Sequence, residues 1–166
     1  GDLGSLAASL GVVVHYLATH TEVQRELRRL DGAGEALAFE AAIEEILRID
    51  DPFVSNRRVT TRDVVAAGVS IPAGSRVILN WTAANRDPAV FGDPDEFDPA
   101  GHAQTNLVFG IGPHVCPGRD LTLMELRVAV AALLHGTSAI DPYPHEQPVR
   151  EQAPGSGWAQ VPVVLR

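Results

Sequence analysis

The single cysteine of this 166-residue chain lies in a loop that is rich in glycine and proline. In the stretch "FGIGPHVCPGRDL" (109–121), Cys116 follows His114 by two positions and comes just before an apolar helical pattern. The N-terminus of a helix has unpaired N–H groups and partial positive charge, and both stabilise a thiolate. The three glycines of the loop allow positive φ angles or the close approach of a flat partner. Such a loop suits a thiolate that acts as an axial metal ligand.

Two other interpretations of Cys116 follow from the residues alone. It can be a buried structural cysteine in a turn, or the nucleophile of a Cys–His hydrolase with His114 as the base. Residues two positions apart in an extended loop tend to point in opposite directions, which places this pair poorly. No oxyanion-site pattern or orienting asparagine is visible. A single cysteine also excludes an internal disulfide and argues against a structural zinc site.

The composition is that of a globular protein, with 45% hydrophobic and 20% charged residues. The formal net charge is −8 and no basic run is present, so nucleic acid is not an expected partner. The sequence shows neither a signal-peptide pattern nor an apolar run long enough to span a membrane. Because the chain starts at Gly1 directly in a helical pattern, we expect it to be part of a longer protein.

Hydrophobic periodicity predicts four long helices, with short β-branched strands between the third and the fourth. We expect the helices at 3–19, from Thr21 to the glycines at 32 and 34, at 35–49 and at 118–135. Thr21 and Gln24 form a capping-box pattern at the start of the second helix. These elements predict one domain over residues 1–166, mainly α with small β-sheets (α+β).

The segment 80–107 is dense in proline, aspartate and glycine, which predicts a long irregular connection. A long coil inside a compact domain is usually functional or disordered. Because Trp81, Phe91 and Phe97 can hold this segment onto the core, we expect an ordered coil.

The cysteine loop resembles the haem-binding signature of the cytochrome P-450 family, F-x-x-G-x-H/R-x-C-x-G, and every fixed position is filled. The resemblance implies the C-terminal part of the cytochrome P-450 fold, with haem b (iron protoporphyrin IX) as the cofactor. By this resemblance, Cys116 is the axial ligand of the haem iron, His114 contacts a propionate and Phe109 shields the sulfur. Gly112 and Gly118 would make room for the haem.

A second motif lies in the helix predicted at 35–49. Glu45 and Arg48 are spaced i,i+3, which puts them on one helix face where they can pair. Such pairs are commonly exposed and contribute little, but the neighbouring apolar residues allow a partly buried site. In the cytochrome P-450 family this pair has a structural role near the cysteine loop. The arginine that the family usually adds after an "FDP" pattern is absent here, and His102 is the candidate to replace it.

The resemblance assigns other roles as well. Arg58 is the candidate for a second propionate contact, since paired carboxylates need cationic partners. In the first helix, Gly4 and Ser5 stand where the family has an acid and a threonine that help deliver protons to bound dioxygen. Ser5 is therefore the candidate catalytic alcohol, or a residue that bonds back to a helix carbonyl. Asp2 lies three residues from Ser5, and the missing acid leaves room for peroxide-driven chemistry.

By resemblance, the parent protein is a monooxygenase that inserts one oxygen atom from O2 into a small organic substrate. Substrate contacts are expected from residues 53–56 and from the turn around Trp158, although Phe53 and Trp158 equally fit core positions. Electrons are expected from a ferredoxin with its reductase, which Arg119 would help to attract. The bacterial resemblance implies a cytoplasmic location.

The resemblance covers only the C-terminal part of the family fold. We therefore expect the fragment alone to be inactive, because much of the haem face and of the substrate pocket would be missing. The alternative from another class is a non-catalytic, truncated remnant that retains the fold.

Overall fold

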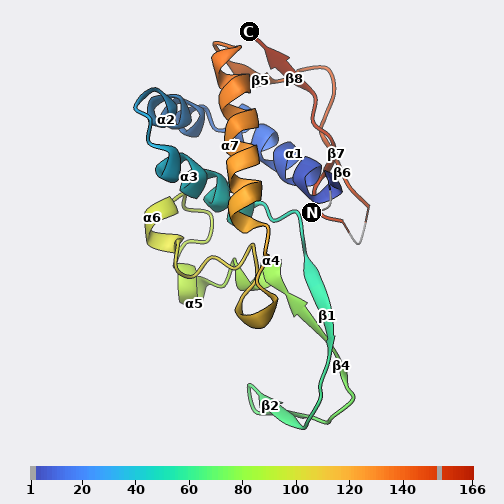
Figure 1. The fold of residues 1–166 in the computed structure, drawn as a ribbon. Coiled ribbons are helices and arrows are strands. Elements are labelled where there is room, and N and C mark those ends of the chain that lie inside the picture. Colours follow the sequence, from blue (N-terminus) through green and yellow to red (C-terminus); the bar gives the residue numbers. More distant parts are fainter. Residues whose placement is uncertain (1–2, 153–154) are drawn as a thin grey trace.

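A body of four long helices carries a β-ribbon that extends away from it (Figure 1). The computed structural model describes residues 3–152 and 155–166. The long helices are α1 (Leu3–Thr19), α2 (Thr21–Gly32), α3 (Ala36–Ile49) and α7 (Arg119–His135). All four predicted helices are present, and the predicted class, mainly α with small β-sheets, is confirmed.

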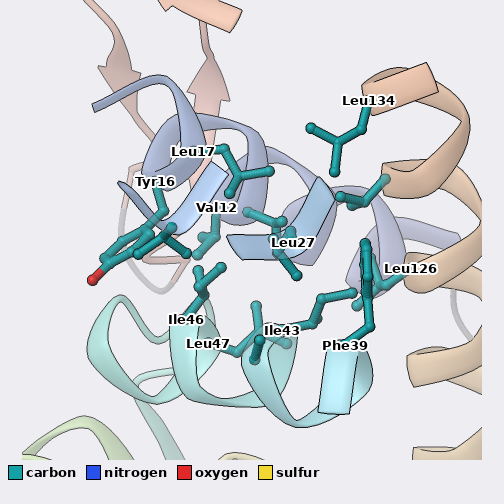
Figure 2. Packing of buried hydrophobic residues seen from close by; sticks show 14 of the residues in the cluster. Val12, Tyr16, Leu17, Leu27, Phe39, Ile43, Ile46, Leu47, Leu126 and Leu134 are labelled. Carbon is teal, nitrogen blue, oxygen red and sulfur yellow. The ribbon is translucent and has the colours of Figure 1, made fainter. Parts of the chain in front are cut away.

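The core forms where the apolar faces of these helices meet (Figure 2). On α7, buried residues recur every three or four positions, which is the spacing of one helix face. The central side chains of the cluster are Val12, Tyr16, Leu17, Leu27, Phe39, Ile43, Ile46, Leu47, Leu126 and Leu134. The cluster thus fixes α3 against α1 and α7, and α3 carries the Glu45–Arg48 motif.

All described sheets are two-stranded and antiparallel. The ribbon in Figure 1 is formed by β1 (Ser55–Val59) and β4 (Arg76–Asn80), with β2 (Val64–Ala66) and β3 (Val69–Ile71) as a second hairpin. The tail contributes β5 (Ile140–Pro142), β6 (Val149–Arg150), β7 (Trp158–Gln160) and β8 (Val163–Leu165). Strand β5 pairs with β8, and β6 pairs with β7.

The segment 80–107 is ordered, but it is more helical than predicted. It contains the short helices α4 (Trp81–Ala84), α5 (Pro88–Phe91) and α6 (Pro99–His102). Each has an Asn or Asp N-cap whose side chain accepts a backbone N–H: Asn80, Asp87 and Asp98. These caps explain why a segment dense in aspartate and proline forms single helical turns rather than coil. Phe91 is buried and Phe97 packs against the core, whereas Trp81 lies at a cavity.

The capping box predicted at the start of α2 is wrong. The N-cap is His20, whose side chain makes no capping hydrogen bond. Gln24 is buried instead, and its amide nitrogen donates to the carbonyl oxygens of Leu17 (3.2 Å) and Ile140 (3.0 Å). Its Oε1 accepts from the Ile140 N–H at 3.1 Å. A tertiary contact with β5 therefore uses the side chain that the local pattern assigned to the helix end.

Within the described residues, no single helix is long and apolar enough to cross a membrane. Helices α1 and α2 reach that length and composition only when taken together, and they meet at a bend of 112°.

Candidate functional site

A cavity of about 860 Å³ lies beside the cysteine loop. Five of the predicted site residues, which come from three separate parts of the chain, line it: Ser5, Arg58, Phe109, His114 and Cys116. The predicted substrate-contact stretch 53–56 lines it as well, together with Trp81 at the start of α4. The structure therefore brings the start of α1, strand β1 and the cysteine loop together around one space.

The backbone of the cysteine loop turns twice before α7 begins. Gly110 and Gly112 have φ angles of 75° and 73°, which L side chains rarely adopt, so glycine is needed at both. A 3₁₀ turn follows, η1 (Gly112–His114), and the Cys116 N–H then donates to the Phe109 carbonyl oxygen at 2.8 Å. This bond closes the loop and fixes the backbone from which the thiol extends.

Gly118 is the N-cap of α7, with φ −94°. A Cβ atom added there would lie 3.9 Å from the Cys116 Sγ and from the Thr122 Oγ1, which are ordinary contact distances. The protein atoms alone therefore do not require glycine at this position. Its predicted role depends on a group bound beside the sulfur.

The Glu45–Arg48 pair is fully buried, with 1% and 0% of the side chains exposed. Nε and Nη2 of Arg48 donate to the two carboxylate oxygens of Glu45, each at 2.8 Å. The remaining Arg48 donors reach three carbonyl oxygens of the segment 80–107, those of Asn85, Pro94 and Glu96. Because this arrangement uses all five N–H groups of a guanidinium, the charge is buried with its hydrogen bonds satisfied.

His102 occupies the place expected for it. Its Nδ1 lies 2.6 Å from Oε1 of Glu45, and the ring is buried against Phe91. Asn85, which is also fully buried, accepts the Leu107 N–H through its Oδ1 at 2.7 Å, just before the cysteine loop. The ion pair thus connects α3 to the base of that loop, and the structural role predicted for Glu45 and Arg48 agrees with these contacts.

Arg58 and His114 both line the cavity, from β1 and from the cysteine loop. The Arg58 Nη1 donates to the Arg57 carbonyl oxygen at 2.9 Å and has donors to spare for a ligand. Arg57, its neighbour, is exposed and does not line the cavity, as expected from the alternation of side chains along a strand. Only one of the two adjacent arginines therefore faces the cavity.

Arg119 is already paired in this structure. Its Nη2 lies 2.5 Å from Oε2 of Glu44 on α3, and its Nη1 lies 3.3 Å from Oδ1 of Asp120. The hydrogen bonds that Arg119 donates to the Glu44 carboxylate raise the pKa of Arg119 above its ordinary value. The charge of this arginine is balanced locally, which argues against the hypothesis that it attracts an acidic partner.

Ser5 and Gly4 line the cavity as expected, and Asp2 lies outside the described residues. Trp158 does not line it. Its ring packs 3.9 Å from that of His15, and its Nε1 donates to Asp50 at 3.0 Å. Trp158 is thus a packing residue, and the hypothesis that it contacts substrate is not supported. Glu151 and Gly155 line the cavity from the tail instead, and no local sequence signal marks them.

The fold and the cavity define an α+β protein whose only thiol faces a space that also contains two basic side chains. The cytochrome P450 family model matches residues 37–162. The chain belongs to the cytochrome P450 family.

Its relatives include Cytochrome P450 144 of Mycobacterium tuberculosis, which is 40% identical over 139 residues, 82% of this chain and 31% of that protein. Cyclomarin C epoxidase CymV of Salinispora arenicola is 39% identical over 80% of this chain and 32% of its own length. Among solved structures, cytochrome P450 TbtJ1 matches with a TM-score of 0.82 and 34% identity, over 97% of this chain and 42% of that one. The chain spans about a third of the length of these curated relatives.

Membership of this family implies a haem cofactor, and the residues of the cavity fit one. No group of three or more His, Cys, Asp or Glu side chains able to hold a bare metal ion occurs among the described residues. A single thiol suits an iron whose other ligands come from a macrocycle. The basic side chains of Arg58 and His114 suit the carboxylates of such a group, and Val108 and Phe109 offer apolar contact.

Proposed function

We propose that this chain supplies the thiolate side of a haem b site in a bacterial monooxygenase, with Cys116 as the axial ligand of the iron. The observation that carries the proposal is that Cys116, His114 and Arg58 line one cavity in a chain of the cytochrome P450 family. Bound there, haem supplies the activation of O2 for insertion of one oxygen atom into an organic substrate.

The residues of this chain hold and orient that group. Cys116 would supply its sulfur as the iron ligand. The hydrogen bond from the Cys116 N–H to the Phe109 carbonyl oxygen positions this residue. Arg58 and His114 would bind the two carboxylates of the haem, and Phe109 would shield the sulfur from water. The buried pair of Glu45 and Arg48 keeps the base of the loop in place through the segment 80–107.

Proton supply and substrate contact come from other parts of the cavity wall. The hydroxyl of Ser5 holds a proton at the cavity wall formed by α1. Phe53 and Val54 supply an apolar surface for a small organic substrate. CymV is named as an epoxidase and a Streptomyces fradiae relative as a 23-monooxygenase, and both names fit insertion of oxygen into an organic molecule.

Electrons come from a small redox protein such as a ferredoxin with its reductase. Because Glu44 pairs with Arg119, attraction of that partner does not rest on this arginine. One solved relative, P450BioI, is described in complex with a fatty acid carried by acyl carrier protein.

The test is a carbon-monoxide difference spectrum of the reduced chain supplied with haem, beside Cys116→Ala. We expect a red-shifted Soret band that depends on the thiolate and is absent from the variant. A band that persists in Cys116→Ala would overturn the ligand assignment. If the full-length parent protein binds haem but does not turn over, with either O2 and a reductant or peroxide, the result would favour the non-catalytic remnant.

A further inference from the structure

Asp51 is a buried carboxyl beside the cavity that the proposed chemistry does not use. The residue is only 4% exposed, although it lies just after α3 and directly before the wall residues Pro52 and Phe53. Its Oδ1 accepts the Phe53 N–H at 2.8 Å. The carboxyl thus fixes the backbone of a residue whose side chain forms part of the cavity wall.

The same carboxyl reaches a second wall. The Thr82 hydroxyl on α4 donates to Oδ2 of Asp51 at 3.4 Å, and Thr82 follows the wall residue Trp81. The N–H groups of Trp81 and Thr82 point to the Val54 carbonyl oxygen, at 2.9 and 3.4 Å. Wall segment 52–56 and helix α4 are therefore joined twice, once through the backbone and once through Asp51.

A third contact connects the C-terminal tail to Asp51. The Ser156 hydroxyl donates to the Asp51 backbone carbonyl oxygen, and the adjacent Gly155 lines the cavity. Three separate parts of the chain that line the cavity thus meet at one residue.

The surroundings make this carboxyl expensive to ionise. Burial, partly offset by the hydrogen bonds, raises the pKa of Asp51 to about 6. From α4 and its C-cap it faces two uncharged groups, Thr82 and the buried amide of Asn85. The charged neighbour is Asp50, which pairs with Arg150 and adds to the upward shift. A buried carboxyl beside a cavity, in surroundings that disfavour its ionised form, indicates a functional role rather than a stabilising one.

We propose that Asp51 is a positioning residue of the cavity: its carboxyl bridges the Phe53 N–H and the Thr82 hydroxyl and thereby sets the shape of the wall that meets the substrate. The inference rests on the proposed use of this cavity as the substrate pocket. When Asp51 gains a proton from solvent, its second oxygen becomes a donor, so the Thr82 hydroxyl must accept rather than donate. The contact that joins segment 52–56 to α4 therefore changes with pH.

The test uses the chain without haem and an uncharged apolar probe, N-phenyl-1-naphthylamine, so its result does not depend on haem binding. The variants are Asp51→Ala, Asp51→Asn and the control Asp87→Ala. Asp87 accepts the equivalent bond, from the N–H two residues ahead, at an exposed site outside the cavity. A second readout, the exchange rate of the Phe53 amide hydrogen corrected for intrinsic exchange, needs no probe.

We expect Asp51→Ala to weaken probe binding at least threefold at pH 7.5 and to speed Phe53 exchange at least tenfold. Asp51→Asn keeps an acceptor for the Phe53 N–H, so it should rescue both values to within twofold and remove a change in probe affinity between pH 5 and 7. Because His114, Cys116 and Glu151 also line the cavity, the pH effect assigned to Asp51 is the difference between wild type and Asp51→Asn.

Two results would overturn the proposal. One is a wild-type pH profile and wild-type Phe53 exchange in both Asp51 variants. The other is an equal loss in Asp87→Ala, which would show that any lost turn bond has the same effect. If Asp51→Ala does not fold, the pH profile of Asp51→Asn decides alone.

Discussion

Nδ1 of His102 lies 2.6 Å from Oε1 of Glu45, although 57 residues separate them along the chain. The same oxygen accepts from Arg48 Nη2 at 2.8 Å and from the Asp98 N–H at 3.2 Å. One buried carboxylate thus joins α3 to the two ends of α6. His102 contributes the contact that the absent arginine was expected to make.

Replacing His102 with alanine should lower the free energy of unfolding by about 1–3 kcal/mol, because a buried carboxylate loses one partner. The matched control is His135→Ala. His135 also pairs with an aspartate, Asp31, but its side chain is 74% exposed, and such a pair is worth about 0–1 kcal/mol. Urea unfolding followed by circular dichroism measures both. Equal losses in the two variants would show that the His102 contact contributes nothing beyond a surface pair.

Arg48 has an exposed counterpart in the same chain. Arg29 binds Glu26 at the same i,i+3 spacing and through the same two nitrogens, but these side chains are 53% and 44% exposed. Arg48→Lys removes two of five donors and leaves buried oxygens unpaired, so a loss of about 3–5 kcal/mol is expected. Arg29→Lys should cost less than about 1 kcal/mol.

The two variants share the spacing and geometry of the Arg–Glu pair, but Arg48 adds three buried bonds to carbonyl oxygens, whereas Arg29 adds only an exposed contact with Glu35. Thermal or urea unfolding of the two variants measures the difference in their free energies of unfolding. The interpretation fails if Arg48→Lys is as stable as Arg29→Lys.

Adjacent arginines on β1 offer a similar test for the cofactor. Arg58 lines the cavity and Arg57 does not. Arg58→Gln should raise the dissociation constant for haem about 10- to 100-fold, because a hydrogen bond to a charged group is worth about 1.5–3 kcal/mol. Arg57→Gln should leave it unchanged. Titration with haem, followed by the Soret band, measures both, and equal effects would point to net charge rather than a specific contact.

The sequence predicted the long helices well because their signal is local: apolar residues recur every three or four positions between clear breaks. It also predicted Cys116, His114, Arg58 and Ser5 as neighbours, although here the information came from the family resemblance. His102 was also predicted from the family resemblance, as the candidate to replace an arginine that is absent here.

Contacts between distant segments left no such local signal. Gln24 looked like part of a capping box, yet its partners lie in α1 and β5. Trp158 looked like a candidate for substrate contact, yet Asp50 holds its indole away from the cavity. The side chain of Asp51 follows a helix end and precedes a proline, so the sequence suggests only a turn. Its burial depends on α4 and the tail, which no window around residue 51 contains.

Asp51 also predicts how stability changes with pH. Its ordinary pKa of 3.8 applies to the unfolded chain, and burial raises the folded pKa to about 6. Between these values the folded chain keeps the proton that the unfolded chain has lost, so stability falls as the pH rises through this window. The full loss is present above pH 6 and amounts to at most about 3 kcal/mol.

Asp51→Asn removes the titrating group but keeps an oxygen that accepts the Phe53 N–H. The variant should therefore match the wild type near pH 4 and become progressively more stable than it up to pH 7, by about 1–3 kcal/mol. Urea unfolding at half-unit pH steps measures the difference. Asp87→Asn, which changes an exposed carboxyl with the equivalent turn bond, shows how much comes from the turn alone. A gap between Asp51→Asn and wild type that stays constant from pH 4 to 7 would mean that this carboxyl ionises in the folded chain as it does in the unfolded one.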